Sequence, residues 1–114
     1  SYTNPVLMST VSTQKITPFL WFDGQAESAI RFYTSLFPNS EILSLKKWGE
    51  GTPNPPDWIM MGSFVINGLH LCAFDAGSTF QFNESISFFV KCKDQQEIDF
   101  YWEKLLEGGG TEQA

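Results

Sequence analysis

The side chains that could do chemistry in this sequence are few, and two of them lie close together. His70 is the single histidine of the chain, and Cys72 follows it in the apolar run Leu69 to Phe74. If this run is a strand, His70, Cys72 and Phe74 share one face, because strand side chains alternate. A histidine titrates near neutrality and can transfer protons. His70 is therefore the candidate catalytic residue; the alternative is a histidine that only hydrogen-bonds within the sheet.

Cys72 is the one thiol with a base nearby, since a cysteine nucleophile needs a neighbouring group to form thiolate. The other thiol, Cys92, has no such neighbour in the pattern. With no C-x-x-C motif and no signal-peptide pattern, we expect two free thiols in a cytoplasmic protein rather than a disulfide.

Metal and cofactor motifs are missing from the pattern. A divalent metal needs at least about three converging His, Cys, Asp or Glu ligands, and His70 has no evident companions. The turn Asp23-Gly24-Gln25 carries one glycine, too few to cradle a nucleotide. We predict no bound metal and no cofactor. A formal charge of −6 with 7 basic residues also argues against nucleic acid, and no apolar run is long enough to span a membrane.

Aromatic residues are abundant, with 11 Phe, 4 Trp and 3 Tyr. Most of them would fill the core, but a cupped sheet could also line a concavity for a planar or apolar small molecule. The predicted ligand-binding residues are Trp21, Trp48, Trp58, His70, Cys72, Phe74, Ser87 and Phe89.

Those side chains must be positioned by an arrangement that occurs twice. The segment from Ile16 to Phe37 reads as a strand, a turn and an amphipathic helix, and the segment from Ser85 to Leu106 repeats it. Both helices carry an I-x-F-Y sequence, beginning at Ile30 and at Ile98, 68 residues apart. The repeat predicts a duplicated strand-and-helix unit.

The first copy begins with a strand over Ile16 to Phe22. Pro18 lacks a ladder donor, which places it at the strand's start or on an edge. Asp23 is expected to accept hydrogen bonds from the first amides of a helix that starts near Gln25. A further strand over Glu41 to Trp48 follows.

A proline-rich loop, Gly49 to Asp57, comes next. The tryptophans at its two ends, Trp48 and Trp58, either cover a pocket or simply anchor the ends of the loop by packing against the protein. Strands over Ile59 to Ile66 and Leu69 to Phe74 then form a hairpin, because Asn67-Gly68 is the strongest two-residue turn signal.

The second copy is expected to contain a strand over Ser85 to Cys92. Asp94 and Glu97 have capping-box spacing before a helix that ends at the glycines from Gly108. We predict residues 1–15 to be a disordered lead-in and 16–114 a single domain, with module one at about 16–75 and a partial module two at about 85–114. The second module lacks later strands, so the chain looks cut short.

This order resembles the vicinal-oxygen-chelate superfamily, which includes glyoxalase I, bleomycin-resistance proteins and extradiol dioxygenases. The closer resemblance is to its PhnB-like branch, labelled "3-demethylubiquinone-9 3-methyltransferase domain". The stretches that carry it are Ile16 to Gly24, Ala29 to Tyr33 with Leu36-Phe37-Pro38, Gly68 to Asp75, and Tyr101 to Leu105.

The resemblance implies an α+β fold of tandem βαβββ modules, with a cupped mixed sheet, helices outside it and the second module incomplete. The superfamily takes metal ligands from the first and last strand of each module. Here the first-strand positions fall among residues 16–18 and 86–88, and the last strand of module one offers His70. The resemblance also implies a homodimer, with or without exchanged strands. Two functions follow: a metal-free small-molecule binding protein, or an enzyme (lyase, isomerase, dioxygenase or methyltransferase) using His70 or a metal site completed on dimerisation.

Overall fold

The computed structural model describes residues 14–80 and 88–107, which fall into two units. The first unit ends at Thr79 and the second begins at Phe80. The elements of the first unit are β1 (Phe19–Phe22), α2 (Ala26–Leu36), β2 (Glu41–Lys47), β3 (Ile59–Ile66) and β4 (Leu69–Asp75). The second unit contributes α3 (Gln95–Glu107).

The strands of the first unit form one mixed sheet in the order β1-β4-β3-β2. β1 runs parallel to β4, with Phe19 opposite Cys72, and the other neighbouring pairs are antiparallel. The parallel pair is joined through α2 and two further strands, as a crossover connection requires. The architecture is α+β, and a cupped sheet with an incomplete second module fits it.

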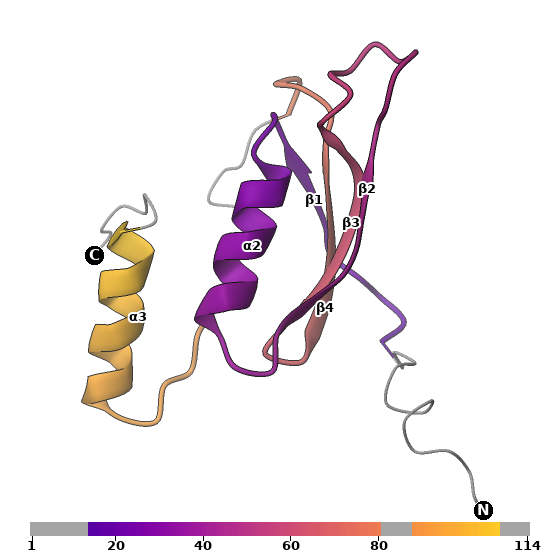
Figure 1. Cartoon of the computed structure of the whole chain (residues 1–114). Coiled ribbons are helices and arrows are strands. Elements are labelled where there is room, and N and C mark those ends of the chain that lie inside the picture. The colour runs from indigo at the N-terminus through magenta and orange to yellow at the C-terminus, as the bar shows by residue number, and fades with distance from the viewer. Residues whose placement is uncertain (1–13, 81–87, 108–114) are drawn as a thin grey trace, which may run out of the picture. The chain divides into compact units, whose positions relative to one another are not determined.

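Helix α2 lies along one face of this sheet (Figure 1). Its Ile30 packs with Phe64, Leu71 and Ala73 in a buried cluster, in which every side chain is at most 2% exposed. The aliphatic face of β4 therefore meets the helix, as the alternation along that strand predicts. Removing these apolar surfaces from water is the main stabilisation of the first unit.

Two predicted strands differ from the structure in instructive ways. The first was expected from Ile16 but begins at Phe19, directly after Pro18, and lies at an edge of the described sheet. The second, β2, shows an imperfect alternation because its register slips between Ile42 and Ser44. Such a bulge leaves Leu43 without a direct partner, and its side chain is 51% exposed.

The hairpin between β3 and β4 is confirmed, with Ile66 opposite Leu69. Asn67 and Gly68 both adopt positive φ, at 47° and 85°, as the predicted two-residue turn requires. The turn is also tied to the start of β2, because the Gly68 N–H donates to the carbonyl of Asn39 at 3.1 Å.

In the second unit, the predicted capping box is formed with a shift of one residue. The Glu97 N–H donates to Asp94 Oδ1 at 2.9 Å, and Glu97 Oε1 accepts in return from the Lys93 N–H at 3.2 Å. The reciprocal bond thus reaches the residue before the cap rather than the cap itself.

The strand expected over Ser85 to Cys92 is not found in its described part. Residues 88–92 have no regular structure, and 85–87 lie outside the described residues, as do the glycines from Gly108. A strand requires a ladder partner, and none of the described strands pairs with 88–92. In the described parts of the chain, neither helix has the length and apolar character needed to cross a lipid bilayer.

Candidate functional site

The sheet face opposite α2 is the part of the first unit best placed to bind a molecule. We call it the open face, because no helix of the described first unit lies against it (Figure 1). Strand neighbours in register point to the same side, and the core residues Leu71 and Ala73 define the other side. The open face consists of Phe19, Trp21, Met61, Ser63, Val65, His70, Cys72 and Phe74, together with Glu41, Ser44 and Lys46 of β2.

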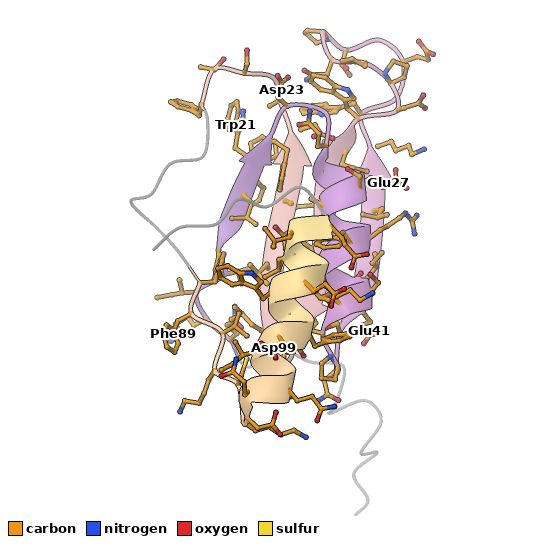
Figure 2. The ribbon with its side chains drawn as sticks, turned by 90° about the vertical axis from the view of Figure 1, so that its left-hand side faces the viewer. Trp21, Asp23, Glu27, Glu41, Phe89 and Asp99 are labelled. Atoms are coloured by element: carbon orange, nitrogen blue, oxygen red, sulfur yellow. The ribbon has the colours of Figure 1, made fainter. Side chains whose placement is uncertain are left out.

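Three aromatic side chains gather on the open face at the β1–β4 pair. Phe74 contacts both Phe19 and Trp21 edge to face, with ring centroids 4.8 Å apart in each case. Edge-on packing is a favoured aromatic geometry and leaves part of each ring available for a further contact. Phe19 is 51% exposed. Trp21 lies at the end of β1 (Figure 2), where its indole N–H donates to the carbonyl of Gly77 at 2.7 Å.

A polar pair lies beside these rings. Ser63 Oγ and His70 Nε2 are 2.7 Å apart, which is a hydrogen bond between side chains of β3 and β4. The imidazole tautomer decides which of the two atoms donates. His70 is half-buried, and its side chain hydrogen-bonds to a side chain of the neighbouring strand. This geometry fits the alternative in which His70 hydrogen-bonds within the sheet.

Ser63 was missed by the sequence analysis, although a signal for it exists. The two-residue turn at Asn67-Gly68 fixes the register of β3 against β4, so Val65 faces His70 and Ser63 faces Cys72. Counting outward from the turn would therefore have placed the Ser63 hydroxyl between the two candidate residues. The measured contact of His70 Nε2 is with Ser63, so the predicted Cys72–His70 pair gains no support from this geometry.

The buried carboxylate of Asp75 is the second residue that sequence reasoning missed. It is 1% exposed, and Oδ1 accepts from the N–H groups of Gly24 and Ala26 at 2.8 and 3.0 Å. Oδ2 accepts from the Ile59 N–H at 2.9 Å. Local spacing could not reveal this, because the residues it caps are about fifty positions earlier in the chain.

Asp75 therefore performs the capping that was expected of Asp23. Asp23 lies exposed in the turn between β1 and α2, with Glu27 beyond it in the first helical turn (Figure 2). Because a protein carboxylate already accepts from the Gly24 and Ala26 N–H groups, these two amides are not free to bind an anionic group of a cofactor.

The tryptophans at the ends of the 49–57 loop have structural partners. Trp48 Nε1 donates to the backbone carbonyl of Asp75 at 2.7 Å, and the Trp48 N–H donates to the Trp58 carbonyl at 2.9 Å. The Trp58 ring lies over Gly24, where an added Cβ would come within 3.2 Å of it. These contacts favour the interpretation in which both side chains seat the loop.

The remaining predicted site residues are not part of the open face described above. Phe89 belongs to the second unit and is 92% exposed; it is labelled in Figure 2. Ser87 lies outside the described residues. Within 14–80 and 88–107, no three His, Cys, Asp or Glu side chains come together as a metal site would require.

The thiols differ in their surroundings. Both are free and half-buried, Cys72 on the open face and Cys92 just before α3. Partial burial raises the pKa of Cys92, and the charge and hydrogen bond of Glu97 and the charge of Asp94 raise it further. Burial and the Glu97 charge also raise the pKa of Tyr101. Both groups are therefore protonated at neutral pH, which makes Cys92 a poor nucleophile.

The mixed sheet with α2 on one face and an open face on the other is the first module of a PhnB-like protein of the vicinal-oxygen-chelate kind. Residues 14–114 match the family described as 3-demethylubiquinone-9 3-methyltransferase, and the chain belongs to that family. Among curated proteins, none matches the chain.

Solved structures of three similar proteins can be compared with this chain. A protein from Bacillus cereus described as a putative 3-demethylubiquinone-9 3-methyltransferase, PhnB protein, is 39% identical with a TM-score of 0.76, over 81% of this chain and 73% of that one. Protein PA1353 from Pseudomonas aeruginosa is 22% identical with a TM-score of 0.61, over 84% and 74%, and shows the fold alone. A Staphylococcus aureus protein is 34% identical with a TM-score of 0.49, over 82% and 68%.

Proposed function

We propose that this protein binds a small apolar or aromatic molecule on the open face, without a resident metal, in the manner of glyoxalase-like resistance proteins. The observation that supports it is the contact of Phe74 with Phe19 and Trp21 on a face that α2 does not cover. The Ser63–His70 pair lies beside these rings and gives them a polar neighbour that can orient a ligand. Apolar walls with few polar groups are typical of small-molecule sites.

The test uses 1-naphthol as a planar aromatic probe, with cyclohexanol as the non-aromatic control, in calorimetric titrations of the full chain. We expect saturable binding of 1-naphthol and much weaker binding of cyclohexanol. Replacing Phe19 or Phe74 by Ala should weaken binding at least about fivefold, because an aromatic contact contributes about 1 kcal/mol beyond its area. No saturable heat with 1-naphthol would sink the proposal.

Phe100→Ala supplies a matched control. Phe100 lies on α3 and is 47% exposed, close to the 51% of Phe19, so the two substitutions remove similar exposed rings. We expect Phe100→Ala to leave 1-naphthol affinity unchanged. Equal losses in both variants would mean that the probe does not discriminate the open face.

An enzyme of the same superfamily is the second candidate, favoured by the 2.7 Å contact between Ser63 Oγ and His70 Nε2. A neutral imidazole held this way can accept a proton from a bound hydroxyl group. The methyl transfer named in the Bacillus cereus description requires a methyl donor. We expect S-adenosylmethionine not to bind this chain, because the turn Asp23-Gly24-Gln25 has a single glycine and Asp75 already accepts from the Gly24 and Ala26 amides. Saturable calorimetric binding of that donor would revive methyl transfer.

We also propose a cytoplasmic homodimer, formed by edge pairing or by strand exchange. It is supported by the free thiols and by the edge positions of β1 and β2 in the described sheet. Light scattering on the eluting protein measures the subunit count, and elemental analysis of the same fractions measures divalent metal. One metal ion per subunit, or per dimer, would overturn the metal-free proposal in favour of a metal-dependent enzyme.

A further inference from the structure

The ladder between β1 and β4 stops at a proline, directly beside the candidate residue His70. The last bond on this side runs from the Cys72 N–H to the Pro18 carbonyl at 2.9 Å. Continuing the parallel register by two residues would set Thr17 opposite His70. The Ile16 carbonyl would then accept from the His70 N–H, and residue 18 would donate to the His70 carbonyl. Pro18 has no N–H, so this second bond cannot form.

The side-chain amide of Gln14 occupies the place of the missing peptide contacts. Gln14 Nε2 donates to the His70 carbonyl at 2.8 Å and to the Ile16 carbonyl at 2.9 Å. Gln14 Oε1 accepts from the His70 N–H at 3.2 Å. One primary amide thus supplies both the donor that Pro18 lacks and the acceptor that Ile16 would have provided.

The backbone of His70 has little choice of partner other than this amide. Alternate residues of a strand direct their N–H and C=O groups to opposite neighbours. Since Cys72 bonds toward β1, His70 does the same, and its pairing with Val65 of β3 leaves the His70 backbone groups pointing to the β1 side. The Gln14 amide therefore fixes the part of β4 from which the imidazole extends to Ser63.

We propose that Gln14 is a positioning residue for the His70 side of the open face: its amide replaces the ladder bonds interrupted at Pro18 and so holds the imidazole on Ser63. This inference rests on the proposed function only in assigning His70 to the binding face. The positioning itself concerns groups within one protein chain, and it can be measured without any ligand.

The experiment records nitrogen-15 NMR spectra of the full chain carrying Gln14→Met, which keeps the length of the side chain and removes its hydrogen bonds. We expect altered ring-nitrogen shifts of His70, reporting a changed Ser63 contact, and about tenfold faster amide exchange at His70, as loss of one hydrogen bond of about 1.4 kcal/mol implies. Gln96→Met, at an exposed position of α3, is the matched control and should change neither signal.

Gln14→Glu adds a pH-dependent arm. A protonated carboxyl group has one donor and one acceptor, enough for the two bonds to the His70 backbone but not for the third bond to the Ile16 carbonyl, whereas the carboxylate would face two carbonyl oxygens without a donor. The His70 amide signal of this variant should therefore approach that of the unmodified protein at acid pH and depart from it as the new carboxyl ionises. The departure should come above about pH 4.3, because the facing carbonyl oxygens disfavour the carboxylate and raise its pKa above the ordinary value. Spectra are compared with the unmodified protein at each pH, so that changes unrelated to residue 14 cancel.

A merely structural role would lower the urea midpoint of Gln14→Met and leave the His70 ring signals unchanged, and that result overturns the proposal. Should Gln14→Met fail to fold, the Gln14→Glu series decides alone: an unchanged His70 signal through the ionisation also overturns it. Failure of 1-naphthol to bind the unmodified protein would count against the proposed function, but not against the positioning.

Discussion

The helices α2 and α3 share a sequence pattern and differ in nearly everything that surrounds it. Each carries I-x-F-Y, yet Ile30 of α2 is 1% exposed whereas Ile98 of α3 is 43% exposed. The cap of α3 comes from the adjacent residue Asp94, whose side chain accepts from the Glu97 N–H. The cap of α2 comes from Asp75, at the end of strand β4 and far away in the sequence. The comparison teaches that one local sequence pattern can be buried or exposed, because burial depends on the surface that the rest of the fold supplies.

Replacing each of the two matched isoleucines by alanine should give the largest difference in stability between the two helices. Ile30→Ala leaves a cavity under α2 and should lower the free energy of unfolding by about 3 kcal/mol. Ile98→Ala removes a largely solvated side chain and should cost less than about 1 kcal/mol. Urea denaturation followed by circular dichroism measures both. Similar losses at the two positions would mean that α3 buries its stripe as α2 does.

The two caps should respond unequally to the same substitution. In Asp75→Asn, the amide must place its N–H₂ group against either Ile59 or the pair Gly24 and Ala26, which leaves at least one buried donor unpaired at about 2 kcal/mol. Asp94→Asn should cost only about 0.5 kcal/mol, because Asn caps a helix nearly as well as Asp. The urea midpoints of the two variants measure these two losses of stability. A smaller loss for Asp75→Asn than for Asp94→Asn would contradict the capping role of Asp75.

A substitution at Gly62 can test how closely α2 approaches the sheet, because the helix packs against this position. A Cβ at this position would lie 2.6 Å from Ile30 Cδ1 and 3.3 Å from the Ala73 carbonyl oxygen. Gly62→Ala should therefore destabilise the protein by about 1 kcal/mol through overpacking. Ile30→Val removes the offending methyl group, so in that background the same substitution should cost less. Additive effects of the two changes in a double-mutant cycle would rule out this contact.

The smallest expected effect concerns the reactivity of the Cys92 thiol, just before α3. Glu97→Gln removes a charge that raises the pKa of Cys92, so the pKa should fall toward its ordinary value and the thiolate fraction at a given alkaline pH should rise. Alkylation of Cys92 by iodoacetamide at pH 8.5 should then be about twofold faster. Mass spectrometry of the same sample follows Cys72 as an internal control. A slower reaction at Cys92 would show that Glu97 does not raise its pKa.

Much of the fold was predictable because its signals are local. The turn at Asn67-Gly68, the break at Pro18 and the apolar stripe that includes Ile30 each depend on a few neighbouring residues, and each prediction from them is confirmed. The strand expected over 85–92 failed in its described part, because an apolar run forms a strand only with a partner, and a partner is a property of the whole sheet.

The candidate site was predictable only in outline. Alternation along β4 placed His70, Cys72 and Phe74 on one face correctly, and the aromatic neighbour Trp21 was also anticipated. The Ser63–His70 contact depends on register across the hairpin, and the capping by Asp75 depends on the parallel β1–β4 pair. The Ser63–His70 contact spans only seven residues and could have been counted from the turn at Asn67-Gly68. The contacts of Asp75 with Gly24 and Ala26 span about fifty residues, for which a single sequence gives no spacing to count.

The contacts of Asp75 have a consequence for how the first unit comes apart. Its carboxylate joins the amides of Gly24, Ala26 and Ile59, and its own carbonyl receives the indole N–H of Trp48. Detaching the start of α2 or of β3 leaves a buried carboxylate with fewer donors, and detaching the loop base leaves the Asp75 carbonyl without its indole donor. Both losses raise the cost of fraying one segment alone. The helix start, the third strand and the loop base should therefore open together, as a single cooperative step.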